Sequence, residues 1–323
     1  MEIVTENIET FIKGNSFDFY IVDEFSRVFA PENSTTFVVK DFAAENLRDL
    51  VNIYSPHYVE LVAIGAGGVL DPAKYLASRF EKRLTVIPTA LSTNSFATNR
   101  SSFLKGDAKV SMTTKAPDRV VLDMGTLSKA GILNSFGLIE LAATATAQVD
   151  WGIAVEAERE DDNKAIRERS EKLVRSTIEL LKSPTNLPKR LSDLLENLIE
   201  SGKLTISFGT GRPVSGTEHI ISAYIENQLH CPHGVGLYVG IQIANKLHRI
   251  RNVSNSSSDN ICASLEQYFE IREYVRKFLP EEQVRNSLAQ LRTREGRYTV
   301  LDIVAQEELD QAINSVCDKI YKI

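Results

Sequence analysis

The sequence predicts two domains, an α/β domain with a parallel sheet followed by a domain made only of helices. Short strand-like segments alternate with helical segments over the first 126 residues, and long amphipathic helical segments dominate the rest of the chain. A chain of 323 residues is also long enough for two hydrophobic cores of ordinary size. We therefore place the domains at residues 1–126 and 127–323.

Five segments of the first domain have the β-branched and aromatic residues, or the continuous apolar runs, that strands favour. They are Phe19–Val22, Thr35–Lys40, Val59–Gly65, Leu84–Pro88 and Arg119–Asp123. Helical spacing over Phe42–Ile53 and Ala73–Phe80 separates some of these segments. Strands that alternate with helices through short connections favour a parallel sheet.

The second domain is expected to be helical. Residues 156–182 are charged on one face and apolar on the other, with Leu173, Ile178 and Leu181 on the apolar side. Such a charge run is typical of a solvated helix face rather than of a binding tract. The polar segment Ser254–Asn260 is interpreted as a loop between helices.

Composition limits the classes of partner. The formal net charge is -6, whereas a general nucleic-acid binder is usually basic. No apolar run approaches the length of a membrane span, and the acidic N-terminal segment does not resemble a signal peptide. The three cysteines form no CxxC pair, which favours reduced thiols and a cytoplasmic protein.

A glycine-rich loop follows the strand that ends at Gly65 and opens the next helix. The segment Gly65–Lys74 includes Gly67 and Gly68, which let the backbone approach a pyrophosphate at the helix N-terminus. It lacks the GxGxxG spacing, and a tight turn without a ligand explains it equally well. The next strand leads into the hydroxyl-rich segment Pro88–Asn94. Ligands of open α/β sheets bind at the carboxyl ends of strands, so the two loops support each other.

Two of the five histidines, His219 and His233, lie at the starts of consecutive predicted helices. Imidazole is the commonest ligand of zinc and similar ions, and a catalytic site uses three protein ligands plus an open position. Glu140 is the best third ligand, because an ionised carboxylate in an otherwise apolar helix is costly to bury without a cation.

Other interpretations of these residues stay open. The two histidines are also compatible with satisfied core or capping positions, and the Glu140 carboxylate with an arginine partner. His230 is a rival ligand close to His233 in the sequence. The remaining histidines, His57 and His248, are expected at the surface.

Six segments, taken in order, resemble the sn-glycerol-1-phosphate dehydrogenase family. Its superfamily also holds glycerol dehydrogenases, iron-containing alcohol dehydrogenases and dehydroquinate synthases. The resemblance covers about Tyr20 to Leu247, and the ordered set is more specific than any single motif. The segments are GAGGVLDPAK (65–74), IPTALSTNS (87–95), KAPDRVVLD (115–123), GLIELAATATAQVDW (137–151), RPVSGTEH (212–219) and PHGVGLYVG (232–240).

The resemblance implies a dehydroquinate synthase-like fold, with an α/β nucleotide-binding domain, an all-α C-terminal domain and the active site in the cleft between them. It implies NAD or NADP as cofactor, and one divalent metal ion, usually zinc, on Glu140, His219 and His233. The implied reaction is the reduction of dihydroxyacetone phosphate to sn-glycerol 1-phosphate. Family members are often dimers or larger, so a homodimer is expected.

The cofactor is expected against the two loops of the α/β domain. The residues assigned to it there are Gly67, Gly68, Asp71, Thr89 and Ser92. Asp23, at the end of the first strand, is expected to contact the adenosine half. Asp41, after the second strand, disfavours a 2′-phosphate and hints at NAD, although Lys40 is adjacent.

Three basic residues are candidates for binding a substrate phosphate. Arg212 suits bidentate binding of an oxyanion and precedes His219 within one motif. Lys115 and Arg100 are weaker candidates, because each taken singly is more often a solvated surface charge. Asn94 stands at a catalytic position where the family has aspartate, and an amide cannot accept a proton as a carboxylate does.

The metal position also departs from the family, which has aspartate where this chain has Glu140. Dehydroquinate synthases usually have glutamate at this position, but they have lysine and histidine where this chain has Ala143 and Ala223. A divergent dehydrogenase is therefore expected, with a sugar-phosphate cyclase of unusual substrate as the alternative. Such a cyclase uses NAD transiently and eliminates phosphate. A non-catalytic homologue that only binds nucleotide is a third hypothesis, which Asn94 keeps open.

Overall fold

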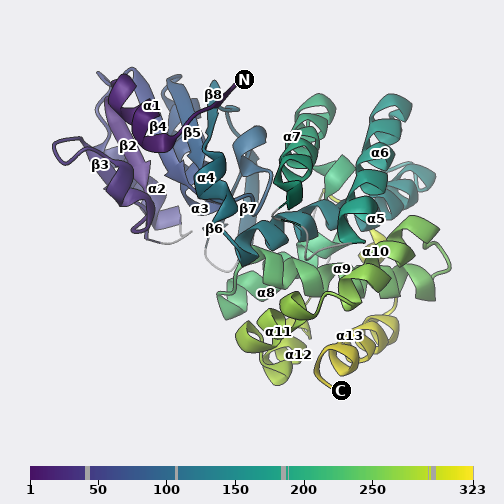
Figure 1. Cartoon of the computed structure of the whole chain (residues 1–323). Coiled ribbons are helices and arrows are strands. Elements are labelled where there is room, and N and C mark those ends of the chain that lie inside the picture. Colours follow the sequence, from purple (N-terminus) through teal and green to yellow (C-terminus); the bar gives the residue numbers. More distant parts are fainter. Residues whose placement is uncertain are drawn as a thin grey trace. The chain divides into compact units, whose positions relative to one another are not determined.

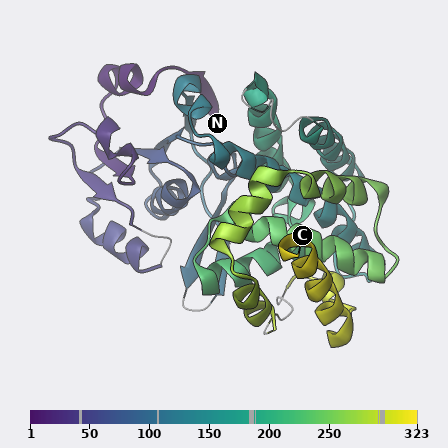
Figure 2. The same ribbon diagram turned by 60° about the horizontal axis from the view of Figure 1, so that its bottom comes forward.

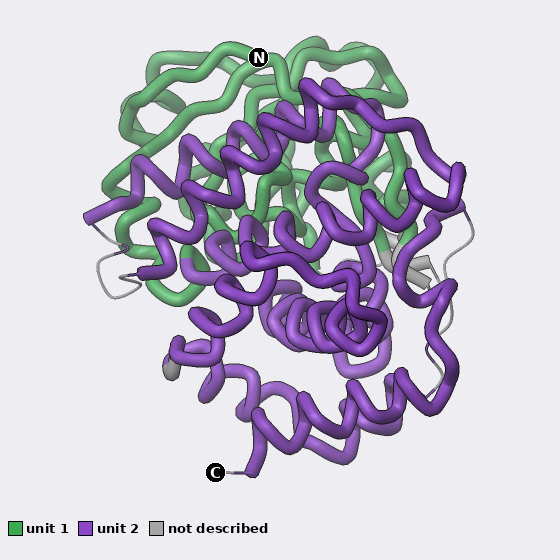
Figure 3. Tube along the Cα trace, turned by 90° about the vertical axis from the view of Figure 1, so that its right-hand side faces the viewer, with its two compact units in different colours: residues 1–134 green, residues 135–323 purple. Residues whose placement is uncertain are grey.

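The structure, a computed structural model, describes residues 1–40, 44–105, 108–182, 187, 189–289, 291 and 296–322. It forms two compact units, Met1–Asn134 and Ser135–Ile323, coloured green and purple in Figure 3. The predicted boundary after residue 126 falls inside α4 (Met124–Ser128), which belongs to the first unit. The side chain of Asn134, the last residue of the first unit, donates to the Leu127 carbonyl and accepts the Leu91 N–H.

The first unit contains the predicted parallel sheet. Its six strands follow the order β1-β8-β5-β4-β2-β3, and all neighbouring pairs are parallel (Figure 1). They are β1 (Glu2–Thr5), β2 (Phe19–Val22), β3 (Thr36–Val38), β4 (Glu60–Gly65), β5 (Arg83–Pro88) and β8 (Arg119–Leu122). Five of them match predicted strands, so the predicted fold class of this unit is confirmed.

Helices and short 3-10 segments connect the strands. They are α1 (Ile8–Gly14), η1 (Ser26–Phe29), α2 (Ala44–Ile53), α3 (Gly67–Arg79) and η2 (Ser95–Ala97). Residues 61–64 of β4 are completely buried, as the near-continuous apolar run of a central parallel strand requires. The core of the first unit therefore lies around β4 and its neighbours.

The prediction misses three strands of this unit. β1 pairs with β8 at the edge of the sheet, and its residues are mostly exposed. β6 (Arg100–Lys105) and β7 (Ala108–Thr113) form a separate antiparallel hairpin. None of the three has the apolar run that made the other strands recognisable.

The second unit is built of helices, as predicted. They are α5 (Ile132–Glu156), α6 (Lys164–Leu181), α7 (Leu191–Phe208), α8 (Thr217–Leu229), α9 (His233–Ile250), α10 (Ser256–Glu266), α11 (Phe269–Phe278), α12 (Glu281–Leu288) and α13 (Gln306–Tyr321). The C-terminal helix α13, yellow in Figures 1 and 2, packs beside α9. None of the described helices is long and apolar enough to cross a membrane.

Helix α5 is the centre of the second unit. Its residues 136–151 are all buried, because the helix is apolar on every side. The few polar side chains in this stretch must find partners inside the protein. Gln148, for example, donates to the Pro213 carbonyl at 3.1 Å. Glu140 and Asp150 are the two carboxylates in this buried stretch, and both contribute to the site described below.

The predicted loop Ser254–Asn260 is wrong in part, because α10 begins inside it at Ser256. The side chain of Asn255 caps this helix by accepting the Ser258 N–H at 2.8 Å. Serine and asparagine favour loops and helix N-caps for the same reason, since their short side chains bond nearby backbone groups. The three cysteines are free and buried, which agrees with the expected absence of a disulfide framework.

Asp123 connects the last strand of the sheet to two helices. One carboxylate oxygen accepts the N–H groups of Gly125 and Thr126 at the start of α4, and the other accepts the Ile8 N–H at the start of α1. Burial opposes ionisation, but these hydrogen bonds outweigh it and hold the pKa of Asp123 below its usual range. The charged form therefore stabilises the folded state.

We expect Asp123→Asn to lower the free energy of unfolding by about 2 kcal/mol at neutral pH, because a carboxylate that accepts several N–H groups becomes a weaker acceptor. A depressed pKa gives stability that is complete above the unfolded value of about 3.9 and is lost as the pH falls through the folded value. Urea titrations should therefore give a difference between wild type and variant that is constant above about pH 5 and shrinks below about pH 4. The exposed Asp49→Asn serves as control. A difference that disappears between pH 7 and 5 contradicts this role.

Candidate metal centre

Three side chains on three helices of the second unit meet at one point. Glu140 comes from α5, His219 from the first turn of α8, and His233 is the first residue of α9. One ligand atom of each residue lies within 4.8 Å of the other two. Oε2 of Glu140 is 3.2 Å from Nε2 of His233 and 3.7 Å from Nε2 of His219. The fold thus brings together the three residues that the sequence predicts as metal ligands.

Glycines let α9 approach the other two helices closely. A Cβ atom on Gly234 would lie 2.4 Å from the ring of Phe136, one turn before Glu140 on α5. A Cβ atom on Gly240 would lie 2.3 Å from the carbonyl oxygen of Glu218 on α8. Both distances are too short for real atoms, so a larger residue at either position would push α9 away. The glycines of this segment therefore serve helix packing around the site.

A buried aspartate fixes the start of α8. Asp150 on α5 accepts the Thr217 N–H at 2.6 Å, at a helix N-terminus where negative charge is favoured. Its other oxygen lies 3.0 Å from Nε2 of His248 and accepts the Val300 N–H at 2.9 Å. Burial opposes ionisation, but these partners outweigh it and lower the pKa of Asp150. Because His219 follows Thr217 by two residues, this contact also positions a metal ligand.

A second carboxylate contacts the Nδ1 atom of each imidazole. Nδ1 of His219 is 2.8 Å from Oε1 of Glu218, and Nδ1 of His233 is 2.7 Å from Oε1 of Glu226. A carboxylate at this position favours the tautomer that carries its proton on Nδ1. The lone pair of Nε2 then faces Glu140 in both rings. This arrangement is the one that metal-binding histidines usually adopt.

The sequence-based prediction does not include Glu218 and Glu226. Glu218 also accepts the Thr146 hydroxyl at 2.9 Å, and both carboxylates are buried. A carboxylate is costly to bury unless it is paired. Two acids beside the isoleucines of the segment Thr217–Leu229 were therefore a usable signal.

The charges at the site stabilise one another. Burial disfavours the charged form of His219, but the carboxylates of Glu140 and Glu218 outweigh it and raise the pKa of His219 to about 9. Burial also opposes ionisation of Glu140, but His219 and His233 hold the pKa of Glu140 far below its usual range. A proton on His219 thus supplies the positive charge that a buried Glu140 needs. A divalent cation between the three ligand atoms supplies the same charge.

The donor set fits a catalytic metal ion. Two imidazole nitrogens and one carboxylate are a usual ligand set of catalytic zinc, which keeps a further position for water or substrate. The side chains of His219 and His233 are 20% and 24% exposed, whereas that of Glu140 is 9% exposed. A small molecule therefore has access to the histidine edge of the site.

In the first unit, the two predicted cofactor loops lie against each other. A Cβ atom on Gly67 would lie 3.3 Å from Oγ1 of Thr93 and 3.4 Å from Oγ of Ser95. Helix α3 begins at Gly67, so the N–H groups of Gly67 and Gly68 have no acceptor within their own helix. Such groups favour phosphate binding, together with the helix dipole. Pyrophosphate binding at Gly67 and Gly68 is compatible with this geometry and stays a prediction.

Asp71 has partners on its own helix and on the hairpin. It forms an ion pair with the buried Lys74 at 2.9 Å and accepts the Ser102 N–H at 2.9 Å. Lys74 also donates to the Arg100 carbonyl. Burial lowers the pKa of Lys74, and Asp71 opposes this shift. These contacts fasten the β6–β7 hairpin to α3, while the cofactor contact assigned to Asp71 stays a prediction.

The other residues assigned to the first unit have varied surroundings. Asp23 accepts the N–H and the hydroxyl of Ser26, both at 2.7 Å, and thereby closes the turn after β2. Asp41 lies outside the described residues. Three predicted residues lie at the end of β5 or in the loop that follows: Thr89, Ser92 and Asn94. Thr89 is buried, whereas the other two are partly exposed.

Arg212, the first candidate for a substrate phosphate, is fully buried. Its Nε donates to Oε2 of Glu160 at 2.6 Å, and its Nη2 donates to the Tyr298 carbonyl at 2.8 Å. These contacts join distant segments of the second unit and support a structural role. They also occupy donors with which an arginine binds an oxyanion.

The other two candidates belong to the first unit. Lys115 forms an ion pair with Asp118 at 2.7 Å. Arg100 donates to the Ser111 carbonyl at 3.1 Å and to the Thr113 hydroxyl across the hairpin. Both therefore have protein partners, and a phosphate contact from either stays a prediction.

The expected surface position of His248 is wrong. His248 is completely buried and bonded to Asp150, which compensates for its burial. His57 is exposed, as expected. His230, the rival ligand, is the exposed C-cap of α8 with φ 49°, and it is not part of the triad.

Comparison with known proteins relates the chain to dehydrogenases. Residues 20–131 match the sequence profile described as iron-containing alcohol dehydrogenase. The NAD(P)+ glycerol-1-phosphate dehydrogenase of Methanococcus aeolicus is 28% identical over 64% of this chain and 63% of its own length. The enzyme of the same name from Archaeoglobus fulgidus is 28% identical over 79% of this chain and 75% of its own length. The chain thus spans just under two thirds of the first of these relatives.

Solved structures share the fold. A probable glycerol dehydrogenase from Sinorhizobium meliloti has a TM-score of 0.73 at 13% identity, covering 100% of this chain and 98% of that one. Maleylacetate reductase from Agrobacterium tumefaciens has a TM-score of 0.68 at 13% identity, covering 98% of this chain and 96% of that one. These likenesses confirm the predicted fold class.

We expect zinc-loaded protein to retain about one metal ion per chain, and Glu140→Gln and His233→Ala to lose it, because each variant leaves two ligands of the three that such a site needs. Elemental analysis after gel filtration measures the metal content. His57→Ala, which changes an exposed histidine, is the matched control and should keep its metal. Stoichiometric metal in both triad variants would contradict the site.

We expect Glu226→Gln to weaken metal affinity about 10- to 100-fold, since loss of the carboxylate on Nδ1 makes the His233 ring a weaker and less well-oriented ligand. Competition with a chromogenic chelator measures this affinity. Glu196→Gln, on an exposed position of α7, makes the same chemical change away from the site. Equal affinities for the two variants would show that Glu226 does not support the ligand.

Proposed function

We propose that the chain is a member of the iron-containing alcohol dehydrogenase family, whose profile residues 20–131 match, and that it is a metal-dependent, NAD(P)-linked dehydrogenase acting on a polyol phosphate. The proposed reaction is that of a glycerol-1-phosphate dehydrogenase, in which dihydroxyacetone phosphate is reduced to sn-glycerol 1-phosphate. The names of the sequence relatives support this choice of substrate.

The main observation that supports the proposal is that ligand atoms of Glu140, His219 and His233 lie close together between three helices. Each imidazole has a carboxylate on Nδ1, and the ligand atoms face one another. Such an arrangement of charges is costly to maintain without a cation. It therefore argues against a homologue that has lost catalysis and only binds nucleotide.

We propose that these three residues hold one divalent ion, most simply zinc. When bound, the ion supplies Lewis acidity toward a substrate carbonyl oxygen. Glu140 contributes the negative charge of the ligand set, and Glu218 and Glu226 keep the Nε2 lone pairs directed at the ion. The partly exposed edges of His219 and His233 leave room for the substrate to approach.

We propose that NAD or NADP binds at the glycine loop of the first unit and supplies the hydride. The N–H groups of Gly67 and Gly68 would hold the pyrophosphate, with the hydroxyls of Thr93 and Ser95 close by. Asn94 in the same loop cannot take a proton as an aspartate would, so a proton relay through it is not part of the proposal. The homodimer implied by the resemblance also stays a prediction.

One observation favours a second candidate, a sugar-phosphate cyclase that uses NAD transiently. Glu140 is the acid that dehydroquinate synthases have at this metal position. Ala143 and Ala223 stand where those enzymes have lysine and histidine, so the cyclase would need an unusual substrate. The dehydrogenase is therefore the preferred function.

We expect the zinc-loaded protein to oxidise NADH or NADPH when dihydroxyacetone phosphate is added, with sn-glycerol 1-phosphate as the product. Absorbance of the reduced nicotinamide follows the reaction, and chiral analysis identifies the product. His233→Ala should lose at least about a hundredfold in rate, because metal-assisted polarisation contributes several kcal/mol. His57→Ala should retain the rate of the wild type.

Two outcomes separate the candidates. No oxidation of either cofactor by metal-loaded protein rules out the proposed reaction. Release of inorganic phosphate from a sugar phosphate, without net change in cofactor absorbance, selects the cyclase. Loss of activity in His57→Ala as well as in His233→Ala would remove the link between activity and the triad.

A further inference from the structure

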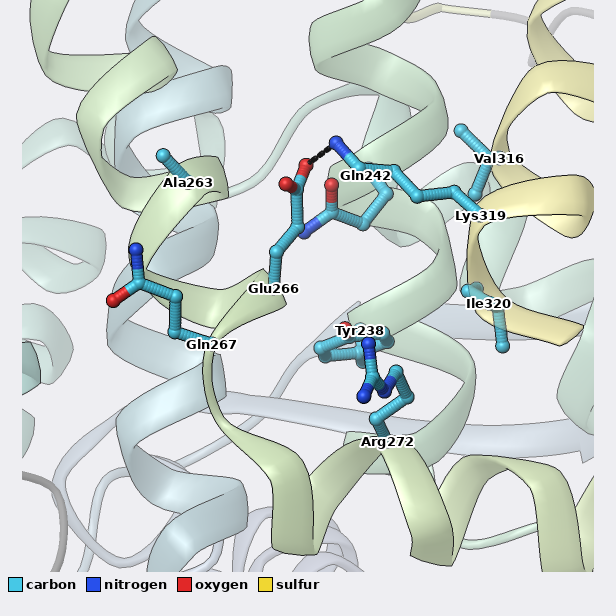
Figure 4. A pocket seen from close by; sticks show the side chains of 9 residues that line it. All are labelled: Tyr238, Gln242, Ala263, Glu266, Gln267, Arg272, Val316, Lys319 and Ile320. Atoms are coloured by element: carbon cyan, nitrogen blue, oxygen red, sulfur yellow. Dashed lines mark ion pairs between the residues drawn. The ribbon is translucent and has the colours of Figure 1, made fainter. Parts of the chain in front are cut away.

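A polar pocket of about 310 Å³ opens in the second unit where four helices meet (Figure 4). Its polar lining includes Tyr238 and Gln242 from α9, Glu266 from α10, Arg272 from α11 and Lys319 from α13. A volume of this size is enough for a small metabolite. The proposed reaction uses none of these residues.

The pocket lies on the side of α9 opposite the metal ligands. Gln242 follows His233 by nine residues on the same helix. At 3.6 residues per turn, nine residues correspond to two and a half turns, so the two side chains leave the helix in roughly opposite directions. The pocket is therefore separate from the candidate metal centre.

The floor of the pocket has unused hydrogen-bonding capacity. Tyr238 is 1% exposed and Gln242 is 7% exposed. Among the described residues, the only hydrogen bond of the Gln242 carboxamide is the one that Nε2 donates to the Cys262 carbonyl at 3.3 Å. The Tyr238 hydroxyl reaches the Leu265 carbonyl at 3.5 Å, and burial raises the pKa of Tyr238, which keeps this hydroxyl neutral. Nearly buried polar groups normally have their bonds satisfied, so a polar ligand is expected to complete these.

The rim of the pocket is cationic. Lys319 reaches from α13 to an ion pair with Glu266 on α10, above Gln242 in Figure 4. Arg272, labelled below Tyr238 in the same view, lines the same pocket. The lining thus has two cations and one carboxylate, a net charge of +1. Guanidinium and ammonium groups together favour the oxygens of a phosphate or carboxylate.

We propose that this pocket binds a small hydroxylated organic anion, whose charged group is a phosphate or a carboxylate. The anionic group lies between Arg272 and Lys319 and competes with Glu266 for the ammonium group. A hydroxyl of the ligand bonds to Gln242 and Tyr238 at the floor. The pocket is thus a second binding site, on the same helix as His233 but independent of the metal.

Isothermal titration of the full chain with inorganic phosphate, and separately with glycerate, tests this proposal. We expect at least one probe to bind, and the probe that binds tells whether phosphate or carboxylate is recognised. Arg272→Gln combined with Lys319→Gln should weaken binding at least about tenfold, because two charge-assisted hydrogen bonds are lost. Glu266→Gln should strengthen binding, since it removes the competing carboxylate.

Two controls separate this site from charge in general and from the metal centre. Lys13→Gln combined with Arg83→Gln removes two exposed, ion-paired cations of the first unit and should bind like wild type. His233→Ala should also bind the probe like wild type. No binding of either probe, unchanged binding in the Arg272 and Lys319 double variant, or loss of binding in His233→Ala would overturn the proposal. Unchanged thermal melting of each variant shows that it is folded.

Discussion

The charge of a carboxylate buried in an apolar helix must be balanced by hydrogen-bond donors or a cation, and α5 carries two such carboxylates. Asp150 is compensated by the N–H groups of Thr217 and Val300 and by His248, which are brought by three other segments of the second unit. Those contacts decide where α8 begins and how the far end of α9 lies. Glu140, nearer the start of α5, is compensated by the imidazoles that α8 and α9 then present. The geometry of the candidate centre follows from this single requirement, and glycines in α9 permit the close packing that it needs.

The balance of charge at the site explains why a cation suits it. Three buried carboxylates, those of Glu140, Glu218 and Glu226, surround two imidazoles. Burial lowers the pKa of His219, but two of the carboxylates outweigh burial and raise this pKa to about 9. Protonation of His219 then offsets part of the negative charge. A divalent ion offsets more of it and uses the Nε2 atoms that the outer carboxylates already orient. The same arrangement accounts for binding and for the preorganisation that catalysis by a metal requires.

Local sequence signals predicted the parts of this protein that depend on local chemistry. The central strands β4 and β5 have continuous apolar runs, and Glu140 stands out as a charge in an apolar helix. The edge strand β1 and the β6–β7 hairpin have no such run and were missed. Pairings over long distances in the sequence were not predicted either. The buried His248 pairs with Asp150, 98 residues away, and Arg212 pairs with Glu160, 52 residues away. No local sequence pattern indicates partners that lie so far apart in the sequence, because only the fold brings them together.

X-ray absorption at the zinc edge of the loaded protein tests the central claim most directly. We predict a first shell of nitrogen and oxygen at about 2.0–2.1 Å, with the outer-shell scattering of two imidazole rings. Zinc added back in excess to His233→Ala should show the scattering of no more than one ring. A sulfur shell at about 2.3 Å, or a spectrum that His233→Ala leaves unchanged, would contradict a centre built from Glu140, His219 and His233.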